Sequence, residues 1–229
     1  MKWNSLEMLS REKKPAQQHD AEPRWPAVIA ILAVGGLYTA LPDALTVGPR
    51  WLFPSLVLAL LIVEVRAHHT GRHELNAIFG FVVEGVLTAG LIISVIRLIS
   101  ALPTGKETPQ ELLLSAASLW TTNILVFALW YWRLDAGGPH QRDKVPGHRQ
   151  GAFLFPQMTM SEDALRESGQ QGWSPDFVDY LFLAFNTSTA FSPTDAPVLA
   201  GWAKILMMVQ SLLSLLIIAL LAARAVNIL

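Results

Sequence analysis

The chain has 229 residues, of which 52% are hydrophobic and only 15% are charged, and its mean hydropathy is +0.38. Soluble domains carry about 25% charged residues, so the composition indicates a polytopic protein whose main partner is the lipid bilayer. The net charge of −1 argues against a basic nucleic-acid-binding face, and the absence of cysteine excludes disulfides and thiolate metal sites.

Six apolar segments follow a polar tail of 24 residues. A spanning helix needs about 20 mostly apolar residues, and the predicted spans are 25–41, 51–65, 75–102, 111–132 and 199–229. A weaker segment, 176–191, starts after Ser174 and Pro175 and would be about 24 Å long at 1.5 Å per residue. We expect an all-α membrane bundle of about six helices, because within one such chain only helices satisfy their backbone in lipid.

The segments divide the chain into four parts. Residues 1–24 form a cytoplasmic tail, 25–132 a four-helix membrane region, 133–175 a cytoplasmic loop and 176–229 a C-terminal helical hairpin. With six crossings and a cytoplasmic N-terminus, 13 of the 17 Lys and Arg residues fall inside and four outside. This bias satisfies the positive-inside rule. It predicts a protein of the cell inner (plasma) membrane with both termini cytoplasmic, and it favours a spanning fifth helix over a re-entrant one.

The C-terminal third carries a resemblance to ion channels. The stretch "FVDYLFLAFNTSTAF" (177–191), then Asp195 and the entry Gly201-Trp202-Ala203-Lys204 into a long apolar helix, resemble the pore-helix and inner-helix half of two-helix channels. Where such a channel has Thr-Val-Gly-Tyr-Gly, this chain has Ala-Phe-Ser-Pro-Thr at 190–194. Without glycines the carbonyl ladder of a potassium filter is not available.

Over its whole length the chain resembles an uncharacterised family of bacterial multi-pass membrane proteins. The stretches that carry this resemblance are "NILVFALWYWRLDAGGP", "FLFPQM" and "DYLFLAFNTSTAFSPTDAPVLAGWAK". The resemblance implies a fold and a membrane location, and it brings no activity and no cofactor.

Glu84 is the most informative single residue, because it lies about 14 Å into the third segment, near the bilayer midplane. Carboxylates at that depth are costly and suggest function. A polar seam for transport is predicted from Glu84, Asn123, Asn186, Thr187, Thr189 and Gln210. Hydrogen bonding between helices accounts for the same residues without transport.

Two further patterns lie outside the spans. Four basic residues after the fourth span predict contact with anionic lipid or a partner: Arg133, Arg142, Lys144 and Arg149. In the same loop "FLFPQM" is expected to dock onto the bundle or the membrane interface. His69 and His73 are four residues apart, the spacing of two metal ligands on one helical face.

These patterns support two hypotheses of different classes. The first is a channel-like or transporter-like protein that passes a small cation or a proton along the seam, with a homo-oligomer required for any central pore. The second is a non-transporting scaffold or regulatory protein that acts through the cytoplasmic loop. An enzyme is not indicated, since neither a nucleophile elbow nor a Walker loop nor a dinucleotide fingerprint is present.

Overall fold

The structure, a computed structural model, describes residues 22–101, 108–144, 151–189 and 196–226. Within these ranges it is all-helical and contains no β-strand, so the predicted fold class is confirmed. The β-type pairing in the same ranges is limited to one isolated bridge between Phe153 and Val198.

Each of the six predicted segments contains a helix close to its predicted range. The long helices are α1 (Trp25–Thr39), α2 (Leu52–His69), α3 (His73–Ala101), α4 (Pro109–Leu134), α7 (Phe177–Thr189) and α8 (Gly201–Val226). The short elements are α5 (Pro139–Arg142), α6 (Glu162–Glu167) and the 3-10 turns η1 (Asp43–Leu45), η3 (Asp135–Gly137) and η4 (Pro156–Thr159). Residues 102, 190–191 and 227–229 of the predicted segments lie outside the described ranges.

Local sequence signals determine where helix α4 begins and ends. At its start, Thr108 Oγ1 accepts the backbone N–H of Glu111 and Glu111 Oε2 accepts that of Thr108, a reciprocal cap. At its end, Ala136 and the two glycines that follow have positive φ. A Cβ on Gly138 would lie 2.8 Å from Arg133 O, so this close turn requires glycine.

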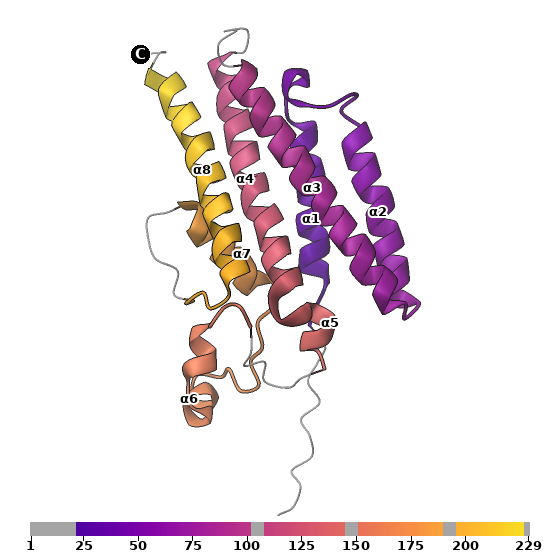
Figure 1. Ribbon diagram of the computed structural model, residues 1–229, viewed down its shortest axis with the longest axis vertical. Helices are drawn as coiled ribbons and strands as arrows, with labels where there is room; N and C mark the ends of the chain where they lie inside the picture. The colour runs from indigo at the N-terminus through magenta and orange to yellow at the C-terminus, as the bar shows by residue number, and fades with distance from the viewer. Residues whose placement is uncertain (1–21, 102–107, 145–150, 190–195, 227–229) are drawn as a thin grey trace, which may run out of the picture.

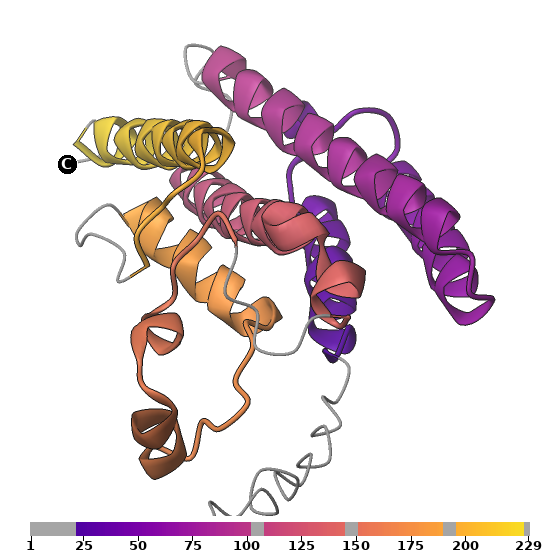
Figure 2. The same ribbon diagram turned by 60° about the horizontal axis from the view of Figure 1, so that its bottom comes forward.

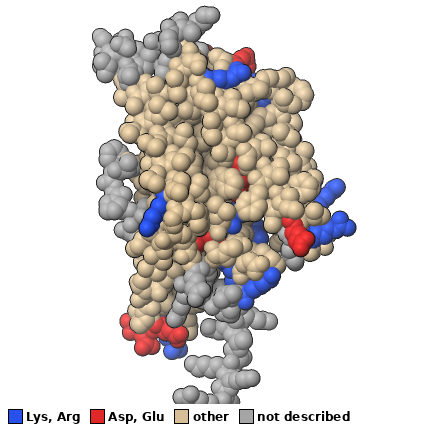
Figure 3. Space-filling model, in the orientation of Figure 1, with Lys and Arg blue, Asp and Glu red and all other residues tan. Residues whose placement is uncertain are grey.

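Four helices of the described chain are long and apolar enough to cross a membrane. They comprise residues Leu52–His69, Glu74–Ala101, Gln110–Gly137 and Gly201–Ala222. Helix α1 is apolar but has 15 residues, about 22 Å at 1.5 Å per residue. Figure 3 shows a long, mostly uncharged surface between the two ends of the bundle on the face drawn.

Helix α4 is the centre of the bundle. It packs against α1 and α3 on one side and against α7 and α8 on the other, while α2 pairs with α3 and α1. Figure 1 shows α1 to α4 running alternately along the bundle axis, and Figure 2 shows α7 beside α4 and α8. We call the end where α4 meets α5 the α5 end.

The fifth long helix runs parallel to the sixth. The ring of Phe153 contacts Tyr180 near the start of α7 and Trp202 near the start of α8, with centroids 6.2 and 6.1 Å apart. Further along both helices, Gln210 Nε2 donates to Ala184 O at 2.7 Å. Both helices therefore begin at the α5 end and point the same way, which corrects the prediction that segment 176–191 crosses the bundle and reverses direction.

The physical reason for this correction is length, because the 13 residues of α7 extend only about 20 Å, short of a hydrocarbon core of about 30 Å. Within the described residues, α8 ends at the opposite end of the bundle from the start of α1 (Figure 1). The cytoplasmic location of both termini stays a prediction. The charge count did not reveal the parallel course of α7 and α8, because this arrangement exchanges only Lys204 and Arg224 between the sides and leaves 13 against four.

The residues that follow position 151 pack against the α5 end of the bundle. Phe153 is fully buried and its ring packs against Tyr131 with centroids 5.3 Å apart. Phe155 is 5% exposed and packs against Tyr180. The prediction that "FLFPQM" docks onto the bundle is therefore confirmed, whereas α6 projects away from it (Figures 1 and 2).

Candidate functional site

Three charged side chains from three helices meet inside the bundle, toward the α5 end. Arg133, in the last turn of α4, donates from Nη2 to Glu64 Oε1 on α2 at 2.8 Å. Its Nε donates to Glu84 Oε1 on α3. Arg133 is 7% exposed, Glu64 8% and Glu84 0%. We refer to these three residues as the Glu64–Arg133–Glu84 cluster.

The guanidinium fits against α3 because position 80 has no side chain. A Cβ on Gly80 would lie 1.8 Å from Arg133 Nη1 and 2.1 Å from its Cζ. Two aromatic residues lie next to the same cation, with Arg133 Cζ 5.9 Å from the ring centroid of Phe81 and 5.7 Å from that of Trp132. Aromatic rings at this distance attract a cation. The surroundings therefore hold one positive charge in a fixed place.

The cluster holds two carboxyl groups and one cation. Arg133 stays protonated at physiological pH and neutralises one of the two carboxylates. Glu64 Oε2 and Glu84 Oε2 are both buried and have no hydrogen-bond partner among the described residues. An uncompensated buried charge costs several kcal/mol. With both carboxylates ionised, the cluster has one excess negative charge, which a proton or a bound cation would remove.

A second buried cluster joins α4, α7 and α8 around Gln210, which is 0% exposed. Its Nε2 donates to Ala184 O and to Ser188 Oγ on α7, both at 2.7 Å. Its Oε1 accepts a bond from Tyr131 OH on α4 at 2.6 Å. The amide nitrogen of Gln210 therefore makes two hydrogen bonds and its amide oxygen makes one. These bonds fix the half-length helix α7 to its two neighbours.

Asn123 extends the same cluster. Its Nδ2 donates to Gln210 O at 3.1 Å and to Ser214 Oγ at 2.8 Å, so α4 is joined to α8 at two points. Its Oδ1 is buried without a hydrogen-bond partner in the described part of the chain. We call Asn123, Tyr131, Ser188, Gln210 and Ser214 the Gln210 cluster.

The structure divides the predicted polar seam into these two clusters. Glu84 contacts α4 from the α3 side, whereas Asn123 and Gln210 lie where α4 meets α7 and α8. Tyr131 and Arg133 are two positions apart on α4, a rotation of about 200° about the helix axis, and each belongs to a different cluster. The seam residues were predicted to be buried and polar, but they do not form one continuous line.

The other predicted seam residues lie at the end of α7. Thr187 is buried and its hydroxyl donates to Leu183 O within its own helix, while its carbonyl accepts a bond from Ser211. Thr189 donates to Asn186 O in the same way. The hydroxyls of Thr187 and Thr189 therefore bond to carbonyls within α7, and the Thr187 carbonyl links α7 to α8. The Asn186 side chain lines a separate pocket.

Two of the four basic residues predicted to contact lipid or a partner are buried. Arg133 belongs to the cluster described above, and Arg142 is 2% exposed. Neither side chain reaches a headgroup, because each is already paired with buried carboxylates. Lys144 is exposed as expected, and Arg149 lies outside the described residues.

Arg142 anchors the start of the described chain to the α5 end. Its Nη2 donates to Glu22 Oε2 at 2.9 Å, and its Nη1 donates to the carbonyls of Trp132 and Asp135 at 2.7 and 2.9 Å. Glu22 Oε1 accepts the indole N–H of Trp132. Burial raises the pKa of the Glu22 carboxyl more than the Arg142 charge lowers it.

The two histidines belong to different helices. Helix α2 ends at His69, Gly71 turns the chain with a φ of +69°, and α3 begins at His73. The four-residue spacing therefore bridges two helices, which corrects the premise of the predicted site. Among the described residues no group of three or more potential metal ligands gathers anywhere.

Three residues in or beside the two clusters were not predicted from the sequence: Glu64, Gly80 and Tyr131. The available signal for Arg133 was its position directly after an apolar stretch, where a long side chain reaches back into the bundle.

A comparison of the chain with protein-family models, with curated proteins and with solved structures found no match. Function therefore has to be inferred from the residues of the clusters themselves.

Proposed function

We propose that this chain is a multi-pass protein of the cell inner (plasma) membrane, channel-like or transporter-like in type, that passes a proton or a small cation through the Glu64–Arg133–Glu84 cluster. The observation that carries the proposal is the composition of that cluster. Two buried carboxylates share one guanidinium, and each has one oxygen without a partner among the described residues. Ionisable groups at such depth in apolar helices are the usual mark of an ion or proton pathway.

The membrane location is supported by the outer faces of the helices. Large apolar side chains on α2, α3 and α8 are exposed, among them Leu56, Leu58, Ile78, Ile96, Leu212 and Leu215. Lipid would cover them at no cost. The Lys and Arg distribution supports a cytoplasmic location for the α5 end.

The cluster would alternate between two charge states. With both carboxylates ionised it holds one net negative charge, and uptake of one proton makes it neutral without moving Arg133. A small hard cation would be held instead by the two free carboxylate oxygens, since such ions prefer oxygen ligands. In either case Glu64 and Glu84 bind the ion, and Arg133 fixes the position of both carboxylates.

The arrangement of α7 and α8 supports the channel-like part of the proposal. A half-length helix that ends inside the bundle, parallel to a long helix, also occurs in the channel hairpins that the sequence resembles. Since one such pair cannot enclose a pore, conduction along it would need a homo-oligomer. The Glu64–Arg133–Glu84 cluster lies on the other side of α4 and does not depend on that assembly.

Proton flux into liposomes tests the proposal directly. The purified protein is reconstituted in vesicles that contain a pH-sensitive dye, and an inward proton gradient or a sodium gradient is applied. We expect wild-type flux to exceed that of empty vesicles and the Glu84→Gln variant to abolish it, because glutamine keeps the shape but neither loses nor gains a proton.

Glu74→Gln is the matched control, because Glu74 is exposed at the start of the same helix. It should leave flux unchanged. Unchanged flux in Glu84→Gln, or wild-type vesicles no more permeable than empty ones to protons and to sodium, would overturn the transport role. The cluster would then serve to hold α2, α3 and α4 together.

A second candidate function is a non-transporting scaffold that acts through residues 133–175. The observation that favours it is α6, which projects from the α5 end and carries the exposed acids Asp163 and Glu167 (Figures 1 and 3). Replacing both acids with lysine would disrupt a partner contact and leave flux intact. A phenotype in that variant at wild-type flux would favour the scaffold function.

A further inference from the structure

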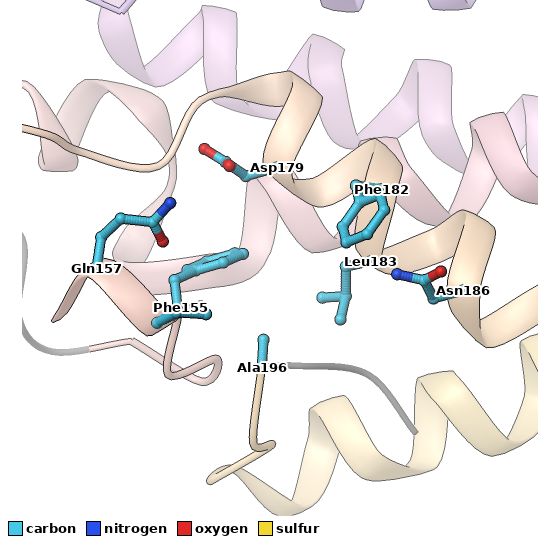
Figure 4. Close-up of a pocket in the computed structure, with 8 residues that line it drawn as sticks. Phe155, Gln157, Asp179, Phe182, Leu183, Asn186 and Ala196 are labelled. Atoms are coloured by element: carbon cyan, nitrogen blue, oxygen red, sulfur yellow. The ribbon is translucent and has the colours of Figure 1, made fainter. Parts of the chain in front are cut away.

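A pocket lies beside α7, between that helix and η4. Its volume is about 130 Å³. Figure 4 shows Asp179 and Gln157 on one side of it, Phe182 and Asn186 on the other, and Phe155 between them.

The pocket offers one carboxylate oxygen and two side-chain amides without a hydrogen-bond partner among the described residues. Asp179 forms no ion pair with a Lys or Arg of the described chain, and its Oδ2 accepts only the backbone N–H of Asp176, at 2.9 Å. The side-chain amides of Gln157 and Asn186 make no hydrogen bond to any described residue. A few polar groups in an otherwise apolar pocket are the usual features of a small-ligand site.

We propose that this pocket binds an ammonium group. The Asp179 carboxylate supplies the opposite charge, and the amide oxygen of Gln157 accepts an N–H bond from the ligand. The rings of Phe155 and Phe182 contact its carbon substituents and attract the positive charge.

Other ligand classes fit less well. An anion would be repelled by Asp179 and by the carboxylates of Asp176 and Glu22, which lie near enough to act on it. An acyl chain would cover the polar side chains and leave them without partners. An ammonium group pairs with Asp179 and Gln157 and also contacts the rings.

The ammonium group has two possible sources, a lipid headgroup or a free amine. The pocket lies near the α5 end, where the rings of Phe155 and Trp173 pack with centroids 5.7 Å apart. Trp side chains gather at headgroup depth in membrane proteins. Phe182 is 56% exposed at the rim, so the pocket is open to the surroundings. Both sources therefore have access, and the test has to distinguish them.

The test uses the full chain in detergent. Ethanolamine and tetramethylammonium are titrated into wild-type protein and Asp179→Asn by calorimetry. Retention of added phosphatidylethanolamine is compared with that of phosphatidylglycerol by native mass spectrometry. We expect the Asp179→Asn variant to bind the amines at least about tenfold more weakly, because a desolvated charge pair is lost. Asparagine can still accept the bond from Asp176 N–H, so the variant should fold.

Asp163→Asn, an equal charge change on the exposed face of α6, is the matched control and should bind like wild type. Phe182→Leu keeps the apolar rim but removes the ring, and should weaken tetramethylammonium more than ethanolamine. Selective retention of phosphatidylethanolamine with weak free amine binding assigns the site to a headgroup. Binding of free amine without lipid selectivity assigns it to a small amine. Wild-type affinity in Asp179→Asn, no amine or lipid binding at all, or equal retention of both lipids without amine binding, overturns the proposal.

The pH dependence provides a further readout. Burial raises the pKa of Asp179 to about 6, and the nearby carboxylates of Asp176 and Glu22 raise it as well. Only the ionised form attracts an ammonium group, so affinity should fall as the pH decreases from about 8 to about 5. Affinity that is unchanged or higher at the lower pH contradicts the assignment of Asp179 as the charged partner.

Discussion

The guanidinium of Arg133 lies where any side chain at position 80 would be, because a Cβ on Gly80 would approach Nη1 to 1.8 Å and Cζ to 2.1 Å. One backbone position on α3 thus determines whether a charge carried by α4 can reach the carboxylate of Glu84, four residues further along α3. The Glu64–Arg133–Glu84 cluster therefore depends on Gly80, a residue that has no charge.

The first prediction concerns this glycine. Gly80→Ala should displace the guanidinium, break its bond to Glu84 and lower the free energy of unfolding by about 3 kcal/mol, the usual cost of breaking a buried ion pair. Unfolding in detergent, followed by circular dichroism, measures the change. Gly85→Ala on the same helix is the control, because a Cβ there meets nothing within 4 Å. It should leave stability unchanged or raise it slightly. Equal stability of the two variants would contradict the prediction.

The second prediction separates Arg133 from its partners. Arg133→Gln leaves two buried carboxylates without a cation and should cost about 3–5 kcal/mol. Adding Glu84→Gln removes one of those charges and should restore part of the loss, so that the double variant is more stable than Arg133→Gln alone. A double-mutant cycle measures the coupling between the two residues. Strictly additive effects would mean that the pair does not interact.

The third prediction concerns the attachment of α7. Gln210→Leu removes three hydrogen bonds to α4 and α7 and leaves Tyr131 OH and Ser188 Oγ buried without this partner. We expect a loss of about 1–3 kcal/mol and faster amide hydrogen exchange in α7 than in α3. Ser211→Ala removes a single bond of 3.2 Å to Thr187 O and should have a smaller effect. Exchange in α7 that stays at the wild-type rate would show that the polar bonds do not hold the helix.

The fourth prediction is a pH dependence. Because burial raises the pKa of Glu22 above its ordinary value of 4.5, the folded protein binds a proton there more readily than the unfolded chain. Its stabilising contribution is therefore complete below pH 4.5 and is lost as the pH rises through the raised pKa. The melting temperature of wild type should therefore fall relative to that of Glu22→Gln as the pH rises above 4.5. A wild-type protein that gains stability over the variant with rising pH would show that the pairing with Arg142 outweighs burial.

The fifth prediction concerns topology. Since α8 begins at the α5 end, a cysteine at Lys204 should behave like one at Ser168 beside α6. With an impermeant maleimide and intact cells, we expect both positions to be protected until the membrane is opened. A cysteine at Ala40, exposed at the opposite end, should be labelled from outside. Labelling of the Lys204 variant in intact cells together with protection of the Ser168 variant would restore a spanning fifth helix.

Much of the bundle could be predicted from local patterns. Apolar length located the helices, and the Thr108–Glu111 cap and the turn after Leu134 mark the ends of α4. The excess of Lys and Arg on the cytoplasmic side does not show whether α7 crosses the membrane. A crossing helix and a re-entrant one both leave 13 of these residues inside and four outside. The shortness of segment 176–191 was the relevant signal.

The site was predicted only in part, for a reason of sequence distance. The depth of Glu84 identified it as unusual, but its partner Arg133 is 49 residues away and Glu64 is 69 residues from Arg133. Local periodicity describes one helix at a time and does not say which faces meet. Arg133 was therefore assigned to the following loop, although its side chain points back into the bundle.

Trp132 and Arg133 are consecutive residues, yet they are held by different partners. The Trp132 indole and carbonyl are bound by Glu22 and Arg142, whereas Arg133 is bound by Glu64 and Glu84. Displacing the last turn of α4 at either residue must therefore displace the other. For an ion bound at Glu84 as proposed above, thermodynamic reciprocity would apply: loosening the Glu22 contact would change the ion affinity at Glu84, and ion binding there would change the Glu22 contact by the same free energy.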